Sequence, residues 1–266
     1  MPFYAHNLCE YSAGVWDYLC SMALWSLDAS EIWFPYRNEM DGDRVAVGAD
    51  LSWQRVLIGF VHACFPYYTQ GEEIAWYSPI SRGVIFPHLL QEATCIKVQN
   101  RNESFAFAWD LHFDEILSGC RRSATDEASW LHNDVFALYQ ELHRQGFAHS
   151  LSVMQEGELV GGIMGVAVGR VFFGLSMYHH IDDASRAGLC YLFQFLKEKK
   201  WKLLDCQWAT PFLKQMGAIE IDRDRFLDLI QPAFQFRTPR GNWSEARTWR
   251  QKDPFPKREK MPLAWH

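Results

Sequence analysis

The stretch that decides the fold runs from residue 149 to residue 178 and reads HSLSVMQEGELVGGIMGVAVGRVFFGLSMY. Its strand-like segments are His149–Gln155, Leu159 to about Val168, and Val171–Tyr178, with turn residues Glu156-Gly157-Glu158 and Gly169-Arg170 between them. Short connections of this composition join neighbouring antiparallel strands. We therefore expect a three-stranded antiparallel meander here.

Helical patterns lie on both sides of the meander. Asn133, a typical N-cap residue, opens an apolar pattern that ends at Gly146. After the meander, a helix over about 184–200 carries one apolar stripe and is preceded by Asp182-Asp183. The remaining expected elements are a strand over Lys202–Gln207, a helix opened by Thr210-Pro211, a strand over 219–221 and a helix over 224–230. This order resembles a GNAT-type acyltransferase sheet, an analogy that assigns no substrate.

The flanking regions suggest two further units. Residues 1–82, with a helical pattern from Trp53 to Ala63, read as a small α+β domain in front of a catalytic domain over 83–231. Residues 232–266 form a basic, aromatic tail in a chain of net charge −6. Such a tail either drapes on an acidic body, the reading we favour, or contacts nucleic acid. The predicted class is thus α+β.

Composition excludes several kinds of protein. No run of 18 uncharged apolar residues exists, and the apolar segment from Leu8 to Leu27 contains Glu10 and Asp17, so we expect neither a membrane span nor a signal peptide. The seven cysteines form no CxxC pair, which is typical of reduced thiols in a cytoplasmic protein. They show no metal-ligand spacing, so no metal is expected.

Motifs for common cofactors are missing. Residues 183–189, Asp-Ala-Ser-Arg-Ala-Gly-Leu, lack the glycine spacing with which a standard GNAT enzyme holds the pyrophosphate of acetyl-CoA. The chain also has no GxGxxG, Walker, HExxH or GxSxG motif. We expect no cofactor and an acyl donor other than acetyl-CoA.

Many ordered segments between residues 33 and 230 resemble the leucyl/phenylalanyl-tRNA–protein transferases. They include Trp33-Phe34-Pro35, Val45–Ser52, Cys64–Tyr67, Ile74–Pro79, Ser129-Trp130-Leu131, Gly146–Ser150, Glu158–Gly162, Phe172–Tyr178, Asp183–Arg186, Leu204–Gln207 and Met216-Gly217-Ala218. The resemblance implies transfer of Leu, Phe or Met from aminoacyl-tRNA to the N-terminal Arg or Lys of a protein, which marks it for degradation. The ester is already activated, so the reaction needs neither ATP nor a metal.

The resemblance also implies a site. Gln207 would hydrogen-bond the reacting groups, and Asp205 would orient it from the same face of a regular strand; the alternative is that Asp205 caps the following loop. The residues expected to bind the aminoacyl group and the 3′ end of tRNA are Tyr67, Trp76, Trp130, Phe172, Phe173, Ser176, Met177, Tyr178 and Ser185. Each aromatic residue could equally belong to the ordinary core.

One substitution marks the chain as a divergent member. The family motif Gly-Glu-Ser-Met-Phe reads Gly174-Leu175-Ser176-Met177-Tyr178 here, so Leu175 replaces a carboxylate. The acceptor is therefore open, and two alternatives remain: an aminoacyl-tRNA-dependent transferase with another acceptor or amino acid, and a non-catalytic RNA- or peptide-binding module. The preferred amino acid, the role of the tail and the oligomeric state are also open.

Overall fold

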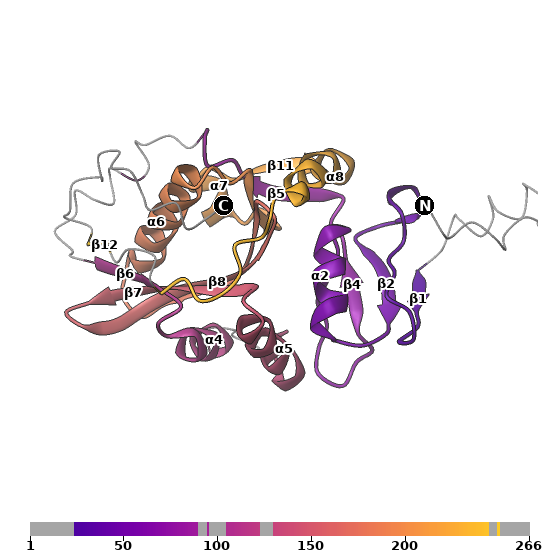
Figure 1. Cartoon of the computed structure of the whole chain (residues 1–266), viewed down its shortest axis with the longest axis horizontal. Coiled ribbons are helices and arrows are strands. Elements are labelled where there is room, and N and C mark those ends of the chain that lie inside the picture. The colour runs from indigo at the N-terminus through magenta and orange to yellow at the C-terminus, as the bar shows by residue number, and fades with distance from the viewer. Residues whose placement is uncertain (1–23, 90–94, 96–104, 123–129, 245–248, 251–266) are drawn as a thin grey trace, which may run out of the picture.

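The computed structural model describes residues 24–89, 95, 105–122, 130–244 and 249–250. A small four-stranded sheet and a large eight-stranded sheet lie side by side (Figure 1). The small sheet has the order β1-β2-β4-β3, and its elements are β1 (Trp25–Leu27), η1 (Arg37–Glu39), β2 (Arg44–Gly48), α2 (Trp53–Val61), β3 (Phe65–Pro66) and β4 (Ala75–Tyr77). The chain is thus of mixed α+β class, and α2 confirms the helix expected from Trp53.

The large sheet has the order β11-β5-β10-β9-β8-β7-β6-β12. Its strands are β5 (Ser81–Ile85), β6 (Phe105–Trp109), β7 (Ala148–Gln155), β8 (Glu158–Val168), β9 (Val171–His179), β10 (Leu203–Gln207), β11 (Ile219–Asp222) and β12 (Trp249–Arg250). β7, β8 and β9 pair antiparallel in sequence order, which confirms the predicted meander. β9 and β10 pair in parallel.

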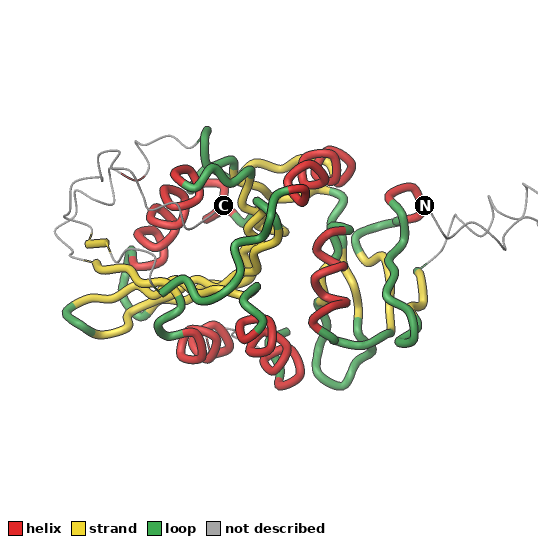
Figure 2. The backbone as a smooth tube through the Cα atoms, in the orientation of Figure 1, coloured by secondary structure: helices red, strands yellow, loops and turns green. Residues whose placement is uncertain are grey.

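Helices cover both faces of the large sheet. They are α4 (Phe113–Arg122), α5 (Asn133–Arg144), α6 (Ala184–Glu198), α7 (Pro211–Gln215) and α8 (Arg223–Ile230), followed by the short 3-10 helix η2 (Gln231–Gln235). α6 lies on one face of the sheet, and α4 and α5 lie on the other (Figure 2). α7 begins as expected, because the Thr210 hydroxyl accepts the amide of Leu213 at 3.2 Å. Asn133, by contrast, is the first residue of α5, and the N-cap is His132.

Two hydrophobic cores hold the layers together. One lies between the sheet and α6, with Trp109, Phe172 and Trp243 among its members. The other core continues from the small sheet into the face of the large sheet that α4 and α5 cover. Within it, the ring centroids of Phe60 in α2 and Phe173 in β9 lie 4.6 Å apart. The N-terminal region therefore shares its core with the rest of the chain.

The first part of the predicted tail belongs to this packing. Trp243 is buried, stacks on His149 at 3.6 Å, and donates its backbone amide to Asp110. A side chain at Gly146 would collide with the backbone of Gly241. Residues 251–266 lie outside the described residues, so the expectation of a draped tail is tested only up to this point.

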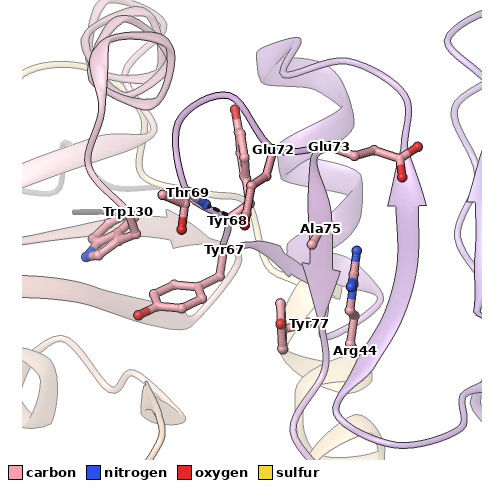
Figure 3. A pocket seen from close by; sticks show the side chains of 9 residues that line it. All are labelled: Arg44, Tyr67, Tyr68, Thr69, Glu72, Glu73, Ala75, Tyr77 and Trp130. Carbon is pink, nitrogen blue, oxygen red and sulfur yellow. Dashed lines mark hydrogen bonds between the residues drawn. The ribbon is translucent and has the colours of Figure 1, made fainter. Parts of the chain in front are cut away.

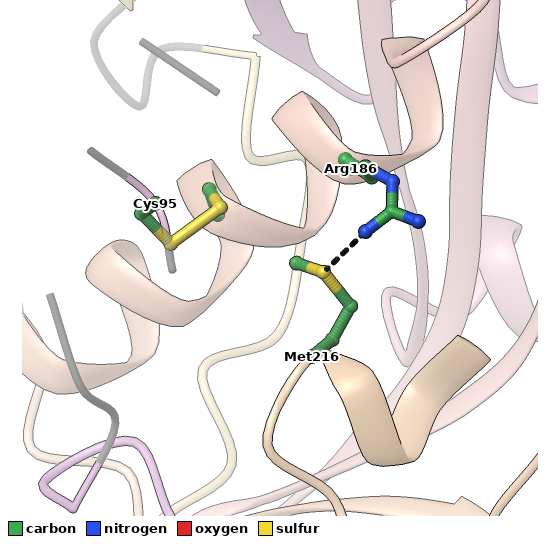
Figure 4. Close-up of a disulfide and its surroundings, with 4 residues drawn as sticks. Cys95, Arg186 and Met216 are labelled. Atoms are coloured by element: carbon green, nitrogen blue, oxygen red, sulfur yellow. Dashed lines mark hydrogen bonds between the residues drawn. A yellow bond between two sulfur atoms is a disulfide. The ribbon is translucent and has the colours of Figure 1, made fainter. Parts of the chain in front are cut away.

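One cysteine pair corrects the expectation of seven reduced thiols. Cys95 and Cys190 of α6 form a disulfide with their Cα atoms 5.5 Å apart (Figure 4). Sequence spacing gave no hint of it because 95 positions separate the two residues. Cys64, Cys120 and Cys206 are free, as expected, and Cys9 and Cys20 fall outside the described part of the chain.

Candidate functional site: a wedge between two parallel strands

β9 and β10 separate partway along their length. They pair in register only from Val171↔Leu203 to Phe173↔Asp205. On its other side, β9 carries a bulge, because Gly174 pairs with Gly165 while Ser176 pairs with Met164, which leaves Leu175 without a partner on β8. Bulges re-aim side chains and commonly border functional sites.

The separation opens a small cavity, called here the wedge. Its volume is about 80 Å³, and its lining residues are Ile163, Gly174, Leu175, Ser176, Met177, Leu189, Leu192, Leu204, Asp205, Cys206 and Leu213. Most of these side chains are apolar, and they come from β8, β9, α6, β10 and α7. The wedge therefore suits an apolar group.

Asp205 is the carboxylate among the residues that line the wedge, and it is fully engaged. Its side chain is completely buried and forms a two-pronged ion pair with Arg82, with Nε–Oδ1 and Nη2–Oδ2 distances of 2.8 and 2.6 Å. Oδ1 also accepts the backbone amide of Gln207 at 2.9 Å. These hydrogen bonds fix the chain around Asp205.

Gln207 occupies an irregular strand end, which corrects the expectation of a regular strand. Its φ is +61°, and the pairing of β10 with β5 shifts register between Asp205 and Gln207. Asp205 therefore holds the backbone of Gln207 in the manner of the loop-capping alternative. The carboxamide of Gln207 has no hydrogen bond to any other described residue and is half-buried. It is thus free to bind a substrate group.

The next residue, Trp208, links the wedge to a group of aromatic rings. Its ring contacts Phe65, Tyr67 and Tyr77 edge-on, with centroids 5.1, 5.5 and 6.1 Å away. A side chain on Gly83 would meet the backbone nitrogen of Ala209 at 2.6 Å, so the close approach of β5 to this segment requires glycine.

A larger, open pocket of about 620 Å³ lies at these rings (Figure 3). Tyr67 and Trp130 face each other across it with centroids 6.3 Å apart and ring planes at 29°. The remaining lining residues are Arg44, Tyr68, Thr69, Glu72, Glu73, Ala75 and Tyr77. Glu72 caps its own loop, because its carboxylate accepts the amide of Thr69 at 3.4 Å. Exposed, roughly parallel aromatic rings are typical of sites that stack a nucleobase.

The other residues expected in the site lie elsewhere. Phe172 and Phe173 are buried in different cores on opposite faces of the sheet, because neighbouring strand residues point in opposite directions. Trp76 is buried in the small sheet and donates its indole N–H to the carbonyl of Gly48. Tyr178 is buried against α4, where a side chain on Gly119 would meet its ring at 2.5 Å.

Ser185 lies at the start of α6, away from both cavities' linings. Its hydroxyl is 2.9 Å from Nδ1 of His179. Ser176 and Met177 line the wedge, and Tyr67 and Trp130 line the aromatic pocket.

Cys206 also lines the wedge, but its thiol is not a nucleophile. Burial, followed by the charge of Asp205, raises its pKa above the ordinary value, so the group stays protonated at neutral pH.

Sequence reasoning assigned no role to Arg82 or Trp208. A signal was present for Arg82, because it precedes the apolar residues Gly83-Val84-Ile85, and an arginine within a buried strand needs a partner. The partner, 123 positions away, was not readable from the sequence.

Two features are absent from the residues that the structure describes. No three His, Cys, Asp or Glu side chains among them gather around a common point where a metal would bind. No described helix combines the length and apolar character needed to cross a membrane.

The structure thus defines an α+β protein with an apolar wedge beside a free amide and an aromatic pocket. Residues 84–231 match the sequence model described as leucyl/phenylalanyl-tRNA protein transferase. Proteins with the same name from Syntrophobacter fumaroxidans and Desulfatibacillum aliphaticivorans are 41% and 38% identical, each over 75% of this chain and 87% of their own length. One from Solidesulfovibrio magneticus is 36% identical over 84% of this chain and 91% of its own. The chain belongs to the leucyl/phenylalanyl-tRNA–protein transferase family.

Among solved structures, L-PGS from Bacillus licheniformis is similar with a TM-score of 0.39 and 12% identity, over 59% of this chain and 65% of that one. This likeness is too distant to support an argument about fold or function.

Proposed function

We propose that the chain transfers Leu, Phe or Met from aminoacyl-tRNA to the N-terminal amine of a protein, with Arg or Lys as the acceptor residue. Besides family membership, one observation carries this proposal: the apolar wedge and the aromatic pocket are joined by the segment Gln207-Trp208. The wedge suits the donor's side chain and the rings suit the terminal adenosine, and Gln207 lies in the chain between Cys206, which lines the wedge, and Trp208, which contacts the rings. An aminoacyl ester of adenosine presents these groups in the same order.

Gln207 would position the reacting groups. Its amide oxygen can accept a hydrogen from the incoming α-amine, and its amide N–H can donate to the ester carbonyl as negative charge develops there. In the reaction the amine nitrogen bonds to the ester carbon, the bond to the ribose oxygen breaks, and the amine proton ends on that leaving hydroxyl. Holding amine and ester together is worth about 7–11 kcal/mol of the barrier, which makes orientation the main task of the protein.

Asp205 would act through the backbone. Its oxygens are filled by Arg82 and by the amide of Gln207, so it is a positioning residue and not a base. The left-handed backbone of Gln207 is a conformation that costs a non-glycine residue on the order of 1 kcal/mol or more, and the Asp205 hydrogen bond offsets it.

Tyr67 and Trp130 would bind the 3′-terminal adenosine by stacking. Tyr67 is 43% exposed, and its ring is presented to the open pocket (Figure 3). Stacking of a base on an aromatic side chain is worth about 1–3 kcal/mol.

The arrangement of the large domain supports a GNAT-like fold. β9 and β10 are parallel, α6 connects them, and the two strands splay beside a bulge, which is where such a fold would hold its acyl group. We place the boundary of the small N-terminal domain between β4 and β5, close to the predicted residue 82. The C-terminal boundary then lies beyond Trp243, because this residue is part of the domain's core.

Leu175 favours a second candidate for the acceptor. Among the residues that line the wedge, the carboxylate of Asp205 is neutralised by Arg82, and position 175 contributes no charge. A basic acceptor residue that approaches the wedge beside the donor's side chain would then find no free acid among the lining residues. A transferase with a neutral acceptor is therefore the alternative.

Transfer assays test both readings. Purified protein is incubated with radiolabelled Leu-, Phe- and Met-tRNA and with peptides that begin with Arg, Lys, Ala or Leu. We expect transfer that falls at least about a hundredfold in Gln207→Ala, the usual cost of losing one oriented donor. The control is Gln194→Ala, whose side chain bonds Glu198 on α6. Unchanged transfer in Gln207→Ala would sink the proposed role.

The acceptor panel separates the two candidates. If Arg and Lys peptides are preferred, the N-terminal basic acceptor stands; equal or better use of Ala and Leu peptides supports the alternative. Leu175→Glu should then shift the preference toward Arg and Lys, because it places a carboxylate in the wedge.

A further inference from the structure

Two cations contact an exposed phenylalanine at the end of the large sheet opposite to the wedge, and two more lie close to them along the chain. Phe236 follows η2 and is 40% exposed. The guanidinium carbon of Arg170 lies 4.1 Å from its ring centroid and Nζ of Lys202 lies 6.0 Å from it. Arg237 is the next residue and Lys200 precedes Lys202 by two positions. We call Arg170, Lys200, Lys202, Phe236 and Arg237 the basic cluster.

Backbone contacts hold the cluster in place. The amide of Arg170 donates to the carbonyl of Ala233 at 3.1 Å, and its own carbonyl accepts the amide of Lys202 at 2.9 Å. The amide of Gly169 donates to the hydroxyl of Thr238 at 2.8 Å. The segment after α8 is therefore fastened to the β8–β9 turn and to the start of β10, and the cations project from a fixed backbone.

The charge of the cluster is not neutralised within the described part of the chain. Lys200, Lys202 and Arg237 are exposed, and none of the four cations forms an ion pair or a side-chain hydrogen bond with another described residue. The nearest acid along the chain, Glu198, is engaged by Gln194 at 2.9 Å. On a chain of net charge −6, four such cations at one place indicate a site for a polyanion.

We propose that the basic cluster binds the phosphate backbone of the donor tRNA behind its 3′ end. The inference rests on the proposed function, because that function supplies the tRNA. Lys202 directly precedes β10 and lies five positions before Gln207, about 16 Å in extended chain; Arg170 directly precedes β9 and lies six positions before Ser176, about 20 Å. Successive phosphates of one strand of a duplex advance about 3.4 Å along the helix axis, so a strand that lies along this span places several phosphates beside it.

An RNA strand fits the cluster better than an acidic protein segment. Its charges lie on a continuous backbone, and the cations come from three segments that hydrogen bonds join: the β8–β9 turn, the start of β10 and the segment after η2. The exposed ring of Phe236 keeps Arg170 and Lys202 together through cation–π contacts, so that both charges face the same way.

The test is a salt series with the full-length protein and deacylated tRNA. Lys202→Glu/Arg237→Glu should bind tRNA about tenfold more weakly near 0.1 M salt, and its log–log salt slope should be smaller by about 2, since each lost phosphate contact removes about one unit. The matched control is Lys214→Glu/Arg225→Glu, which changes the net charge equally at exposed positions of α7 and α8. A milder pair, Lys202→Gln/Arg237→Gln, should show a smaller loss in the same direction.

Transfer kinetics provide a second measurement. With aminoacyl-tRNA as donor, the Glu pair should raise KM about tenfold with kcat unchanged; with an aminoacyl-adenosine, which lacks the phosphates, its rates should equal those of the wild type. That result also shows that the variant is folded.

Two outcomes would overturn the inference. Equal losses in the cluster and control variants would reduce the effect to net charge. Unchanged tRNA binding together with lost binding of poly-glutamate would assign the cluster to an acidic protein. If the wild type binds tRNA but transfers no amino acid, the proposed function fails. The tRNA affinities of the wild type and the variants can still be compared across the salt series, so the inference about the basic cluster is tested separately.

Discussion

The ion pair between Arg82 and Asp205 should be the most sensitive polar contact of the site. Arg82→Met removes the cation and leaves a carboxylate that is completely buried. Removing one partner of a buried pair costs about 3–5 kcal/mol. The Arg82 side chain also donates to the carbonyl of Ala63 at 3.0 Å and lies 4.9 and 4.6 Å from the rings of Phe65 and Phe226. These contacts add about 1–2 kcal/mol, so we expect a total loss of about 4–7 kcal/mol.

Urea unfolding followed by tryptophan fluorescence measures this loss at pH 7. Asp205→Asn in the Arg82→Met background should recover part of it, because the buried charge is then gone. Lowering the pH toward 5 should likewise recover part of the stability that Arg82→Met loses, since protonation removes the charge of a buried carboxylate that lacks a cation. Arg82→Lys, which keeps the charge but loses the two-pronged geometry, serves if Arg82→Met does not fold.

An exposed ion pair supplies the control. Lys214 and Glu220 lie 2.7 Å apart with side chains 49% and 44% exposed, so Lys214→Met should cost no more than about 1 kcal/mol. A loss below about 1 kcal/mol in Arg82→Met, or no recovery in the double variant, would refute the reasoning. Arg82→Lys should lower transfer activity strongly while it lowers the free energy of unfolding only in part. The reason is that Asp205, without its two-pronged ion pair, would no longer hold the backbone of Gln207 in place.

Three further predictions concern other parts of the fold. Gly83→Ala should reduce transfer and cost about 1–3 kcal/mol of stability in urea unfolding, because its methyl group would meet backbone after β10 at 2.6 Å; wild-type activity would contradict that approach. Burial lowers the pKa of His149, although the carboxylate of Asp110 opposes this effect. The unfolded state therefore binds more protons, and the free energy of unfolding falls as the pH drops below about 6.5. His149→Phe should flatten this dependence of stability on pH, whereas the exposed-site variant His88→Gln should leave it as in the wild type. Under oxidising conditions Cys190→Ser should lower the free energy of unfolding by about 2–4 kcal/mol relative to the wild type, and after reduction the two proteins should be equally stable. A difference that persists in reductant would exclude the bond to Cys95 as its cause.

Local pattern was sufficient for most elements of the large sheet. Strand alternation and glycine turns determine the meander from 149 to 178, because short connections leave antiparallel pairing as the simple solution. Thr210-Pro211 likewise determines the start of α7 through its own hydroxyl. The resemblance placed Leu175, Ser176 and Met177 in one segment, and the structure has them lining one cavity.

The site itself was only partly predictable. Phe172 and Phe173 looked like equivalent aromatic candidates, but adjacent strand residues face opposite layers, and both faces of this sheet are covered. The tail offered a similar difficulty. Its basic composition suggested a separate unit, although Trp243 fills a place in the core that no local pattern reveals.

The sequence by itself determined the class of fold, the family and the segment Asp205-Cys206-Gln207 as the polar end of a strand. Those properties depend on residues that are near neighbours along the chain. Only the tertiary structure decided that Arg82 neutralises Asp205, that Gln207 leaves the strand with its amide free, and that Trp208 joins the wedge to the aromatic pocket. The contacts of Arg82 and of Trp208 join positions far apart in sequence, and such pairs are selected by packing and charge compensation once the sheet has formed. The conformation of Gln207 depends on a short-range hydrogen bond from Asp205, which that buried ion pair holds in place.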